Sequence, residues 1–326
     1  MECERLVGVL IRKSHLFIHP MRDSHDRQYT LSWITDANEL AGDPDSIDEF
    51  FELYQDPTNF PDPDELEDPD FIRDRIASSN NNPHTHLLIF KLRNADGKPR
   101  VIAGGIIEFY PDSCCILVTY LFVHEAFRGF KLPGQHQNIA EIMIHSEQGL
   151  VGLVRHLAKK YGKEVKAVFF ESNNPYQTDS ASDSMPPEMR LRFFKRNGGK
   201  KVDFEYIQPP LDDDKGIVTN MYLLCFPGIS GLSDKMPIGV VMGFLIELSK
   251  SLDQNKPPGS PACYGLERYQ RDREVISNLN ASNLDLIALE GFVVQGVNVI
   301  QTMYQSLLDR RVDGEKVALI AIPGAA

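Results

Sequence analysis

The sequence predicts an α+β protein: a mixed, mostly antiparallel sheet flanked by helices, with an added helical segment towards the C-terminal end. Residues 115–123 form an unbroken run of β-branched, aliphatic and aromatic side chains, long enough for one buried strand. Two further apolar runs, 87–92 and 101–110, precede it and are separated from it by turn residues. A long amphipathic helical pattern follows at residues 138–161. Strands before and after a helix are typical of an α+β sheet built around the run at 115–123.

The first part of the chain alternates well enough at residues 29–35 to be a strand, and Asp36 can cap a helix after it. A helical spacing of apolar residues follows at 46–54. Residues 56–70 are rich in proline and acidic side chains and indicate a surface loop. Pro69 suits the first turn of a short helix that ends at Ile76.

The next three apolar runs are predicted to be antiparallel strands. The Asp96-Gly97 dipeptide between the first two favours a hairpin turn, and Pro111-Asp112 turns the chain into the third. The third run ends at a polar turn that contains Arg128-Gly129. A strand, a polar loop and a helix in this order can present backbone N–H groups to an anionic ligand.

The helical pattern at 138–161 is interrupted by Gly149 and Gly152, each of which costs about 1 kcal/mol inside a helix. We therefore expect a break near Gly149. The strand predicted at 165–170 should lie parallel to the one before the loop, because a helix crosses between them. A short helix at 188–195 and a final antiparallel pair of strands, 201–207 and 217–225, complete the sheet region.

The pattern changes to helices after Pro227-Gly228. The sequence therefore predicts two regions: a sheet domain at residues 1–227, whose first 27 residues are an N-terminal extension, and a helical C-terminal region at 228–326. Helices are expected at residues 238–252, 266–278 and 284–308, and a closing strand at 317–322. The apolar run at 292–300 must be buried. It can pack on the sheet, cover an acceptor site or form a homodimer interface through the C-terminal helices.

Composition narrows the class of partner. The 326 residues carry a formal net charge of −12, which disfavours a nucleic-acid partner and favours cationic or amine-bearing ligands. The five cysteines include no CxxC pair, so neither a disulfide framework nor a zinc site is indicated. His84 and His86 lack a third nearby ligand, and no metal site is expected. Without a membrane-length apolar run or a signal-peptide pattern, the prediction is a cytoplasmic protein with no membrane partner.

Three segments together resemble a known family. Val123 is followed, after four residues, by Arg128-Gly129; residues 169–175 are a strand that contains Asn173; and residues 192–198 are a helix end that finishes with a glycine. In order and spacing, these segments resemble the GNAT superfamily of acetyl-CoA-dependent N-acetyltransferases over residues 28–227. The resemblance implies transfer of an acetyl group from acetyl-CoA to a primary amine of a small molecule or peptide, by direct attack of the amine.

The resemblance also implies roles for individual residues. The strand that ends at Val123 would orient the pantetheine arm with its backbone, and the loop after it would hold the pyrophosphate. An acidic loop at 56–70 would suit a cationic amine, although its composition favours a solvated surface loop. The cofactor-binding residues implied are Leu121, Phe122, Val123, Arg128, Gly129, Lys131, Gly134 and Asn173.

Acetyl transfer to an amine needs a group that takes the amine proton and one that protonates the departing thiolate. Some family members carry a glutamate on the central strand where this chain has Leu117. The base is then Glu108, Glu171 or a water molecule, although Glu108 is also readable as an outward-facing strand residue. Tyr206 or Tyr120 is the candidate proton donor to the thiolate.

The chain departs from the family pattern in the loop and at the helix end. Lys131 and Pro133 stand at the two glycine positions of the phosphate loop, unless residues 129–148 are an insertion and Gly149 begins the displaced helix. Phe194 stands where the family usually has a tyrosine, and phenylalanine cannot donate a proton. These departures support a second hypothesis, in which the fold is kept but catalysis is lost and the protein is a binding or scaffolding module.

Overall fold

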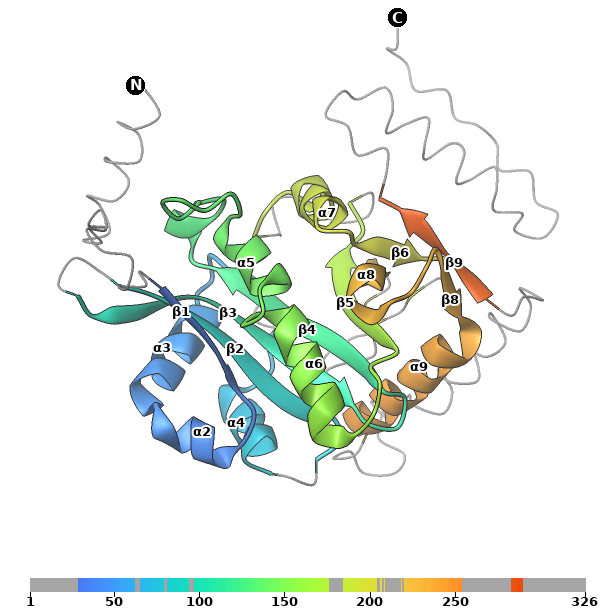
Figure 1. Ribbon diagram of the computed structural model, residues 1–326, viewed down its shortest axis with the longest axis horizontal. Coiled ribbons are helices and arrows are strands. Elements are labelled where there is room, and N and C mark those ends of the chain that lie inside the picture. The colour runs from blue at the N-terminus through green and yellow to red at the C-terminus, as the bar shows by residue number, and fades with distance from the viewer. Residues whose placement is uncertain are drawn as a thin grey trace, which may run out of the picture.

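One nine-stranded sheet organises the part of the chain that the computed structural model describes, which is residues 29–61, 65–78, 81–93, 97–175, 184–203, 206, 208, 218, 220–253 and 283–289. The parallel pair β4–β5 lies between strands that pair antiparallel. The predicted mixed, mostly antiparallel sheet is therefore confirmed (Figure 1). In sheet order the strands are β1 (Tyr29–Ile34), β2 (His84–Arg93), β3 (Pro99–Tyr110), β4 (Cys115–Val123), β5 (Ala167–Asn173), β7 (Met221–Cys225), β6 (Lys200–Val202), β9 (Asn283–Ala288) and β8 (Lys235–Pro237).

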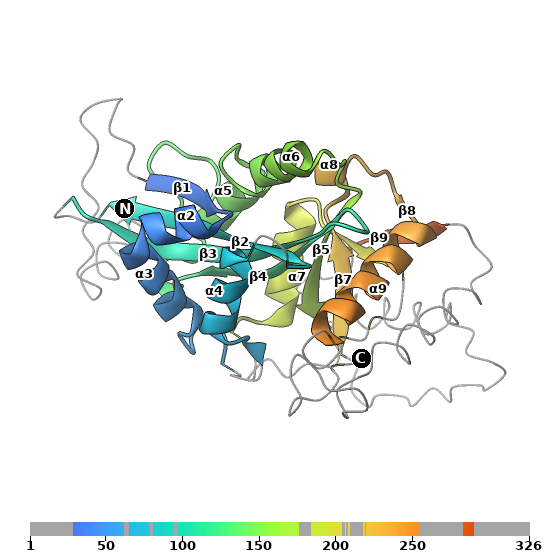
Figure 2. The same ribbon diagram turned by 90° about the horizontal axis from the view of Figure 1, so that it is seen from below.

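Helices cover both faces of the sheet. Figure 2 shows α3 (Pro44–Tyr54), α4 (Pro69–Ala77) and α9 (Ile238–Asp253) on one face, and α5 (Ile139–His145), α6 (Leu150–Tyr161) and α8 (Pro227–Ser230) on the other. The short α2 (Ala37–Gly42) precedes α3 and is capped by Asp36, as the sequence predicts. The remaining helix, α7 (Pro187–Arg196), follows β5. The predicted flanking helices are therefore present on both sides.

The predicted long helix is two helices, broken where the glycines lie. A capping box between Asn138 and Glu141 begins α5, and α6 begins after Gly149. A Cβ at Gly149 would lie 2.2 Å from the carbonyl oxygen of Met143, and one at Gly152 would lie 1.8 Å from that of Glu147. Both positions require glycine because the backbone of the connecting turn approaches them closely.

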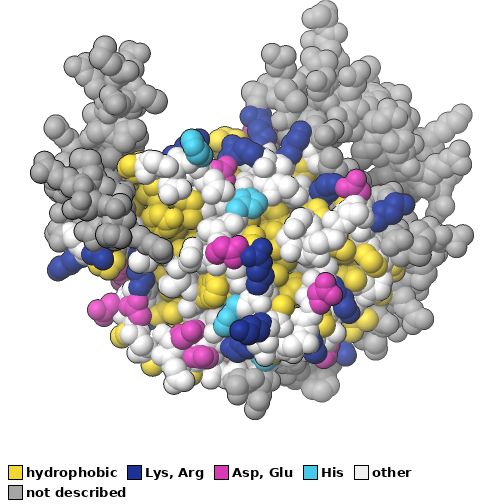
Figure 3. Space-filling view, viewed as in Figure 1, with side chains coloured by type: hydrophobic (Ala, Val, Ile, Leu, Met, Phe, Trp, Pro, Cys, Tyr) yellow, Lys and Arg dark blue, Asp and Glu magenta, His cyan; other side chains and the backbone are white. Residues whose placement is uncertain are grey.

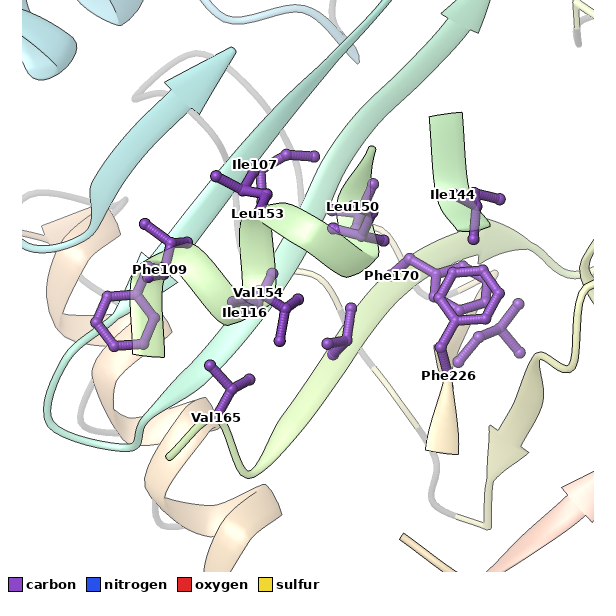
Figure 4. Packing of buried hydrophobic residues seen from close by; sticks show 14 of the residues in the cluster. Ile107, Phe109, Ile116, Ile144, Leu150, Leu153, Val154, Val165, Phe170 and Phe226 are labelled. Atoms are coloured by element: carbon purple, nitrogen blue, oxygen red, sulfur yellow. The ribbon is translucent and has the colours of Figure 1, made fainter. Parts of the chain in front are cut away.

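The stripe of apolar side chains along α6 forms one core with the sheet. Leu150, Leu153 and Val154 point onto β3, β4 and β5 (Figure 4). Phe170 of β5 stacks on Phe226 with ring centroids 4.4 Å apart. The sheet is thus held rigidly on this face next to the point where β4 and β5 end.

The opposite face of β4 and β5 is covered by α9. The ring of Phe244 lies 5.3 Å from that of Tyr110 and 4.6 Å from that of Phe169. The buried carboxylate of Glu247 accepts hydrogen bonds from Asn82 Nδ2 (2.8 Å) and from the backbone N–H groups of Asp112 (2.9 Å) and Ser113 (2.7 Å). This carboxylate therefore ties α9 to the turn between β3 and β4.

One prediction for the C-terminal region is wrong. Residues 283–288 form β9, paired with β6 and β8, where the sequence predicted the start of a helix at 284–308. The alternation of Leu284 and Leu286 matches a strand, and the open edge of β6 provides its partner. The predicted N-terminal extension, the helix at 266–278, the apolar run at 292–300 and the strand at 317–322 lie outside the described residues. The domain boundary at residue 227 stays a prediction. Within the described ranges, none of the helices has the length and apolar character that crossing a bilayer requires.

Replacing Glu247 with alanine is expected to destabilise the protein. The change leaves three donors without their acceptor, one of them buried and two partly buried, so the free energy of unfolding should fall by about 2–4 kcal/mol. Urea denaturation monitored by circular dichroism measures this change. Lys250→Ala, an exposed position on the same helix, is the matched control and should change stability by less than about 0.5 kcal/mol. An equal effect of the two variants would contradict the anchoring role.

His86 should make stability depend on pH. Burial and the charge of Lys160 lower the pKa of His86 to about 3, from an ordinary value of 6.5. Between these values the unfolded chain binds a proton that the folded chain does not, so His86 lowers the unfolding free energy as pH falls, by about 1.4 kcal/mol per unit. His86→Leu should remove this slope between about pH 6 and pH 4 in urea denaturation. His136→Gln, at an exposed site, should retain the wild-type slope.

Candidate active site

The two central parallel strands separate from each other. β4 and β5 pair at four positions, from Cys115–Ala167 to Val118–Phe170. Beyond that point β4 continues to Val123 and β5 continues to Asn173, and no pairing joins these two described segments. Each strand remains paired on its other side, β4 with β3 and β5 with β7. The sheet is therefore open between the ends of β4 and β5.

A β-bulge lies where the separation begins. Ile107 pairs with Val118 and Ile106 pairs with Tyr120, so Thr119 is an extra residue on β4. Bulges bend a strand and increase its twist. The extra residue also places Leu117 and Tyr120 on the same face of the sheet, although they are three residues apart.

A cleft of about 1050 Å³ occupies the opening. Its walls include four of the predicted cofactor-binding residues, namely Leu121, Phe122, Val123 and Asn173. Thr119 and Ser172 also border the cleft, and their hydroxyl oxygens are buried and have no hydrogen-bond partner among the described residues. Buried polar atoms normally have a partner, so these two hydroxyl groups are exceptions beside the cleft. Sequence reasoning missed both, because a threonine or serine in a strand has no distinctive pattern.

Arg128 closes one end of the cleft by joining three segments. Its guanidinium donates to the carbonyl oxygens of Val123 (3.1 Å), Ser184 (2.9 Å) and Thr58 (2.5 Å), and to Asn59 Oδ1 (2.8 Å). Burial, with the nearby charge of Arg190 as a smaller cause, lowers the pKa of Arg128. These contacts hold the end of β4 against the loop after α3 and the start of α7.

The remaining predicted loop residues divide into two groups. Gly129 borders the cleft and has a positive φ of 72°, which favours glycine. Lys131 and Gly134 are exposed and lie outside the cleft lining. The loop bonds to itself there, through a bridge between Lys131 and Asn138 and a hydrogen bond from the N–H of Gln135 to the carbonyl of Leu132 (2.9 Å). The structure thus brings Arg128 and Gly129 to the cleft but not Lys131 and Gly134.

Glu108 faces the cleft from within a buried charged network. Its carboxylate accepts a hydrogen bond from Tyr110 Oη (2.7 Å) and forms an ion pair with Arg75 Nη1 (2.8 Å). Arg75 also pairs with Glu67, and the two carboxylates raise the pKa of the arginine. Burial raises the pKa of Tyr110 well above its ordinary value, and the charge of Glu108 raises it further. Glu108 therefore faces inward, and its negative charge is balanced by a fixed cation.

Glu171 and Tyr206, predicted separately, form a pair. Tyr206 Oη donates to the carboxylate of Glu171, which also accepts from Gln208 Nε2 (3.1 Å). Glu171 is partly exposed and borders the cleft, whereas Tyr206 is buried and lies outside the lining. The structure therefore presents the carboxylate to the cleft and keeps the phenol in the core next to it.

Tyr120 and Phe194, the other two aromatic residues considered for thiolate protonation, each contact another group of the protein. Tyr120 Oη donates to the carbonyl oxygen of Glu65 (2.8 Å), and burial raises the pKa of this phenol well above its ordinary value. Phe194 borders the cleft and packs on Phe170 with ring centroids 4.2 Å apart. The position at which the family usually has tyrosine is thus filled by an apolar contact.

Charged side chains of both signs border the cleft. Four glutamates line it, and Phe60, Tyr120 and Phe122 lie beside them. Four arginines line it as well, one from the loop after β4 and three from α7. The glutamates are Glu65, Glu67, Glu108 and Glu171, and the arginines are Arg128, Arg190, Arg192 and Arg196. The α7 arginines were not predicted, because a basic helix is most often a solvated surface.

No group of three or more histidine, cysteine, aspartate or glutamate side chains that could hold a metal ion occurs among the described residues. His84 instead stacks on Tyr161 with ring centroids 4.6 Å apart.

Comparison with known proteins gives weak matches. No family model matches the chain, and no curated protein sequence matches it. Among solved structures, the catalytic domain of the Tetrahymena GCN5 histone acetyltransferase in complex with coenzyme A is 12% identical, with a TM-score of 0.32, and the match covers 62% of this chain and 94% of that one. A second Tetrahymena GCN5 structure is 13% identical, with a TM-score of 0.29, and covers 60% of this chain and 96% of that one.

Arg128→Lys is expected to loosen the closed end of the cleft. A lysine ammonium cannot reach three separate segments at once, so the free energy of unfolding should fall by about 2 kcal/mol. Urea denaturation measures the loss, and hydrogen exchange should increase at residues 58–59 and 184. Arg155→Lys, the same substitution at an exposed arginine on α6, should be neutral. Unchanged protection at residue 58 in Arg128→Lys would show that these contacts do not hold the loop.

Proposed function

We propose that the protein is an acetyl-CoA-dependent N-acetyltransferase that acts on a positively charged primary amine of a small molecule or peptide. The observation that carries the proposal is the cleft between the diverging ends of β4 and β5. It is large enough for a thioester arm and an acceptor together, and it has a cationic and an acidic part.

The thioester arm would lie along the open side of β4. The carbonyl of Val123 accepts from Arg128, but the other backbone groups of residues 121–123 that face away from β3 have no strand beside them among the described residues, so they can bond to the amides of a pantetheine chain. Thr119 Oγ1 and Ser172 Oγ are additional partners, and Asn173 lies on the facing strand. Acetyl-CoA would supply the activated acetyl group.

The acceptor would lie against the acidic and aromatic part of the cleft. A primary amine is protonated near neutral pH, and carboxylates with aromatic faces stabilise an ammonium group. Glu65 and Glu67 belong to the acidic loop that the sequence predicted at the acceptor wall. Tyr120 and Phe122 extend this wall with apolar surface for the rest of the acceptor.

Glu171 is the proposed base. It borders the cleft, is partly exposed, and accepts from two neutral donors, Tyr206 and Gln208, that hold its orientation. Glu171 would take a proton from the ammonium, directly or through water, before the amine attacks the thioester carbon. Glu171 would pass this first proton to solvent, take the second proton that the nitrogen loses as the amide forms, and give that second proton to the departing thiolate, so that the net reaction releases one proton.

Tyr206 and Glu108 then have supporting roles in the proposal. Tyr206 is a positioning residue, since its hydroxyl reaches Glu171 and its ring is buried. Glu108 is held by Arg75 and Tyr110 and would contribute negative charge to the acceptor wall.

One observation favours the second hypothesis, a binding module without catalysis. Phe194 provides no proton donor at the usual place and is packed against Phe170. The two hypotheses differ in turnover: only the enzyme releases CoA from acetyl-CoA when an amine is present. Calorimetry with acetyl-CoA, followed by a CoA-release assay on a panel of polyamines and lysine-containing peptides, separates them. Absence of acetyl-CoA binding to the wild-type protein would overturn the enzyme hypothesis, whereas amine acetylation in the CoA-release assay would overturn the binding module.

Glu171→Gln is expected to lower kcat by about 100-fold or more, because general-base catalysis contributes at least that much. The KM for acetyl-CoA should stay near the wild-type value, since the amide keeps the shape of the carboxylate. Glu108→Gln should act mainly on the KM for the amine. Glu164→Gln, at an exposed site, controls for loss of negative charge. If Glu171→Gln turned over at the wild-type rate, the base assignment would be wrong.

A further inference from the structure

The loop that should hold the phosphates of the cofactor is directed away from the cleft. Lys131 and Gly134 are exposed, and Pro133 between them has no N–H group to donate. The N–H groups of Phe130 and Gln135 are bonded within the loop, to the carbonyls of Phe127 (3.0 Å) and Leu132 (2.9 Å). Arg128, the cation at the start of this loop, donates to four protein oxygens. A diphosphate therefore needs other cations.

The α7 helix provides them. Arg190, Arg192 and Arg196 all border the cleft, and Arg192 and Arg196 lie one helical turn apart. Lys and Arg side chains gather over α7 in the space-filling view (Figure 3). Arg196 also pairs with Glu141 of α5, at 2.8 Å.

Arg128 stands apart from Glu108 along β4. Glu108 lies opposite Leu117, near the paired end of β4, whereas Arg128 bonds to the carbonyl of Val123 at the other end of the strand. The strand between these positions spans roughly 15–20 Å. Arg190 lies near enough to Arg128 for the two positive charges to interact.

From this arrangement we infer that Arg190, Arg192 and Arg196 of α7 bind the phosphate groups of the nucleotide half of acetyl-CoA, in place of the N–H groups of loop 129–134. The inference rests on the proposed function and specifies which part of the protein recognises the nucleotide. Guanidinium groups bind phosphate oxygens in bidentate fashion, and this pairing is stronger than that of a lysine ammonium. The cofactor would thus be held by its thioester arm on β4 and by its phosphates on α7.

The test compares two acetyl donors in binding experiments. Acetyl-CoA carries the phosphates, whereas acetyl-pantetheine has the same thioester arm without them. The double variant Arg190→Gln/Arg192→Gln should raise the Kd for acetyl-CoA by about tenfold to a hundredfold, the loss expected for two charged hydrogen-bonding groups. The Kd for acetyl-pantetheine should not change. Isothermal titration calorimetry measures both.

Lys195→Gln is the matched control, because Lys195 is an exposed cation on the same helix and lies outside the cleft lining. It should leave both affinities at the wild-type value. Arg196→Gln gives an independent single-site measurement, and adenosine 3′,5′-bisphosphate should compete with acetyl-CoA for the wild-type protein. These two measurements decide the question even if the double variant does not fold.

The outcomes are distinguishable. Equal acetyl-CoA affinity in the wild type and in the arginine variants would overturn the inference and leave the proposed function standing. A parallel loss of acetyl-pantetheine binding would also overturn it, since the arginines would then support the cleft as a whole. Failure of the wild-type protein to bind either donor would instead reject the proposed function, and the inference with it.

Discussion

The divergence of β4 and β5 is the constraint on which the rest of the site depends. Backbone N–H and C=O groups in a protein interior need partners, so a sheet opens only where something else can supply them. Here each strand is fixed on its far side, β4 by β3 and β5 by β7, and the bulge at Thr119 bends β4 where pairing stops. The opening is therefore produced by the sheet itself, which gives it more rigid walls than surface loops would.

Charges of both signs border this opening. The carboxylates come from Glu65, Glu67, Glu108 and Glu171, and the guanidinium groups come from Arg128 and from three arginines of α7. The Glu67–Arg75–Glu108 network limits the cost of burying two carboxylates, because a single arginine pairs with both. Arg128 differs from Arg75, because its charge is spread over neutral oxygens that fix the loops around the cleft.

Local signals predicted much of the fold. The β4 run, the Asp36 cap and the glycines that divide α5 from α6 act over a few residues, and the structure contains each of them. Glu108 and Glu171 were recognisable as charges within apolar strands.

The bulge at Thr119 could not be predicted from the sequence, because the register of a strand depends on its partner strand rather than on the residue itself. Likewise, two of the acceptors of Arg128, the carbonyls of Ser184 and Thr58, lie 56 and 70 positions away in the chain, and no local pattern connects them to it. The β9 segment was misassigned because only the free edge of β6 distinguishes a strand from a helix there.

The hydrogen bonds of Glu247 to the turn between β3 and β4 fix α9 to the sheet. The same helix, α9, contributes Leu248 and Leu252 to the cleft wall. The helix α9 lies beyond residue 227, in the region that the acetyltransferase resemblance does not include, and it thus forms part of the wall of the cleft. A recombinant fragment that ends at residue 227 would lack α9 and therefore one wall of the cleft. Its apolar surface at Tyr110 and Phe169, which α9 covers, would be exposed to water.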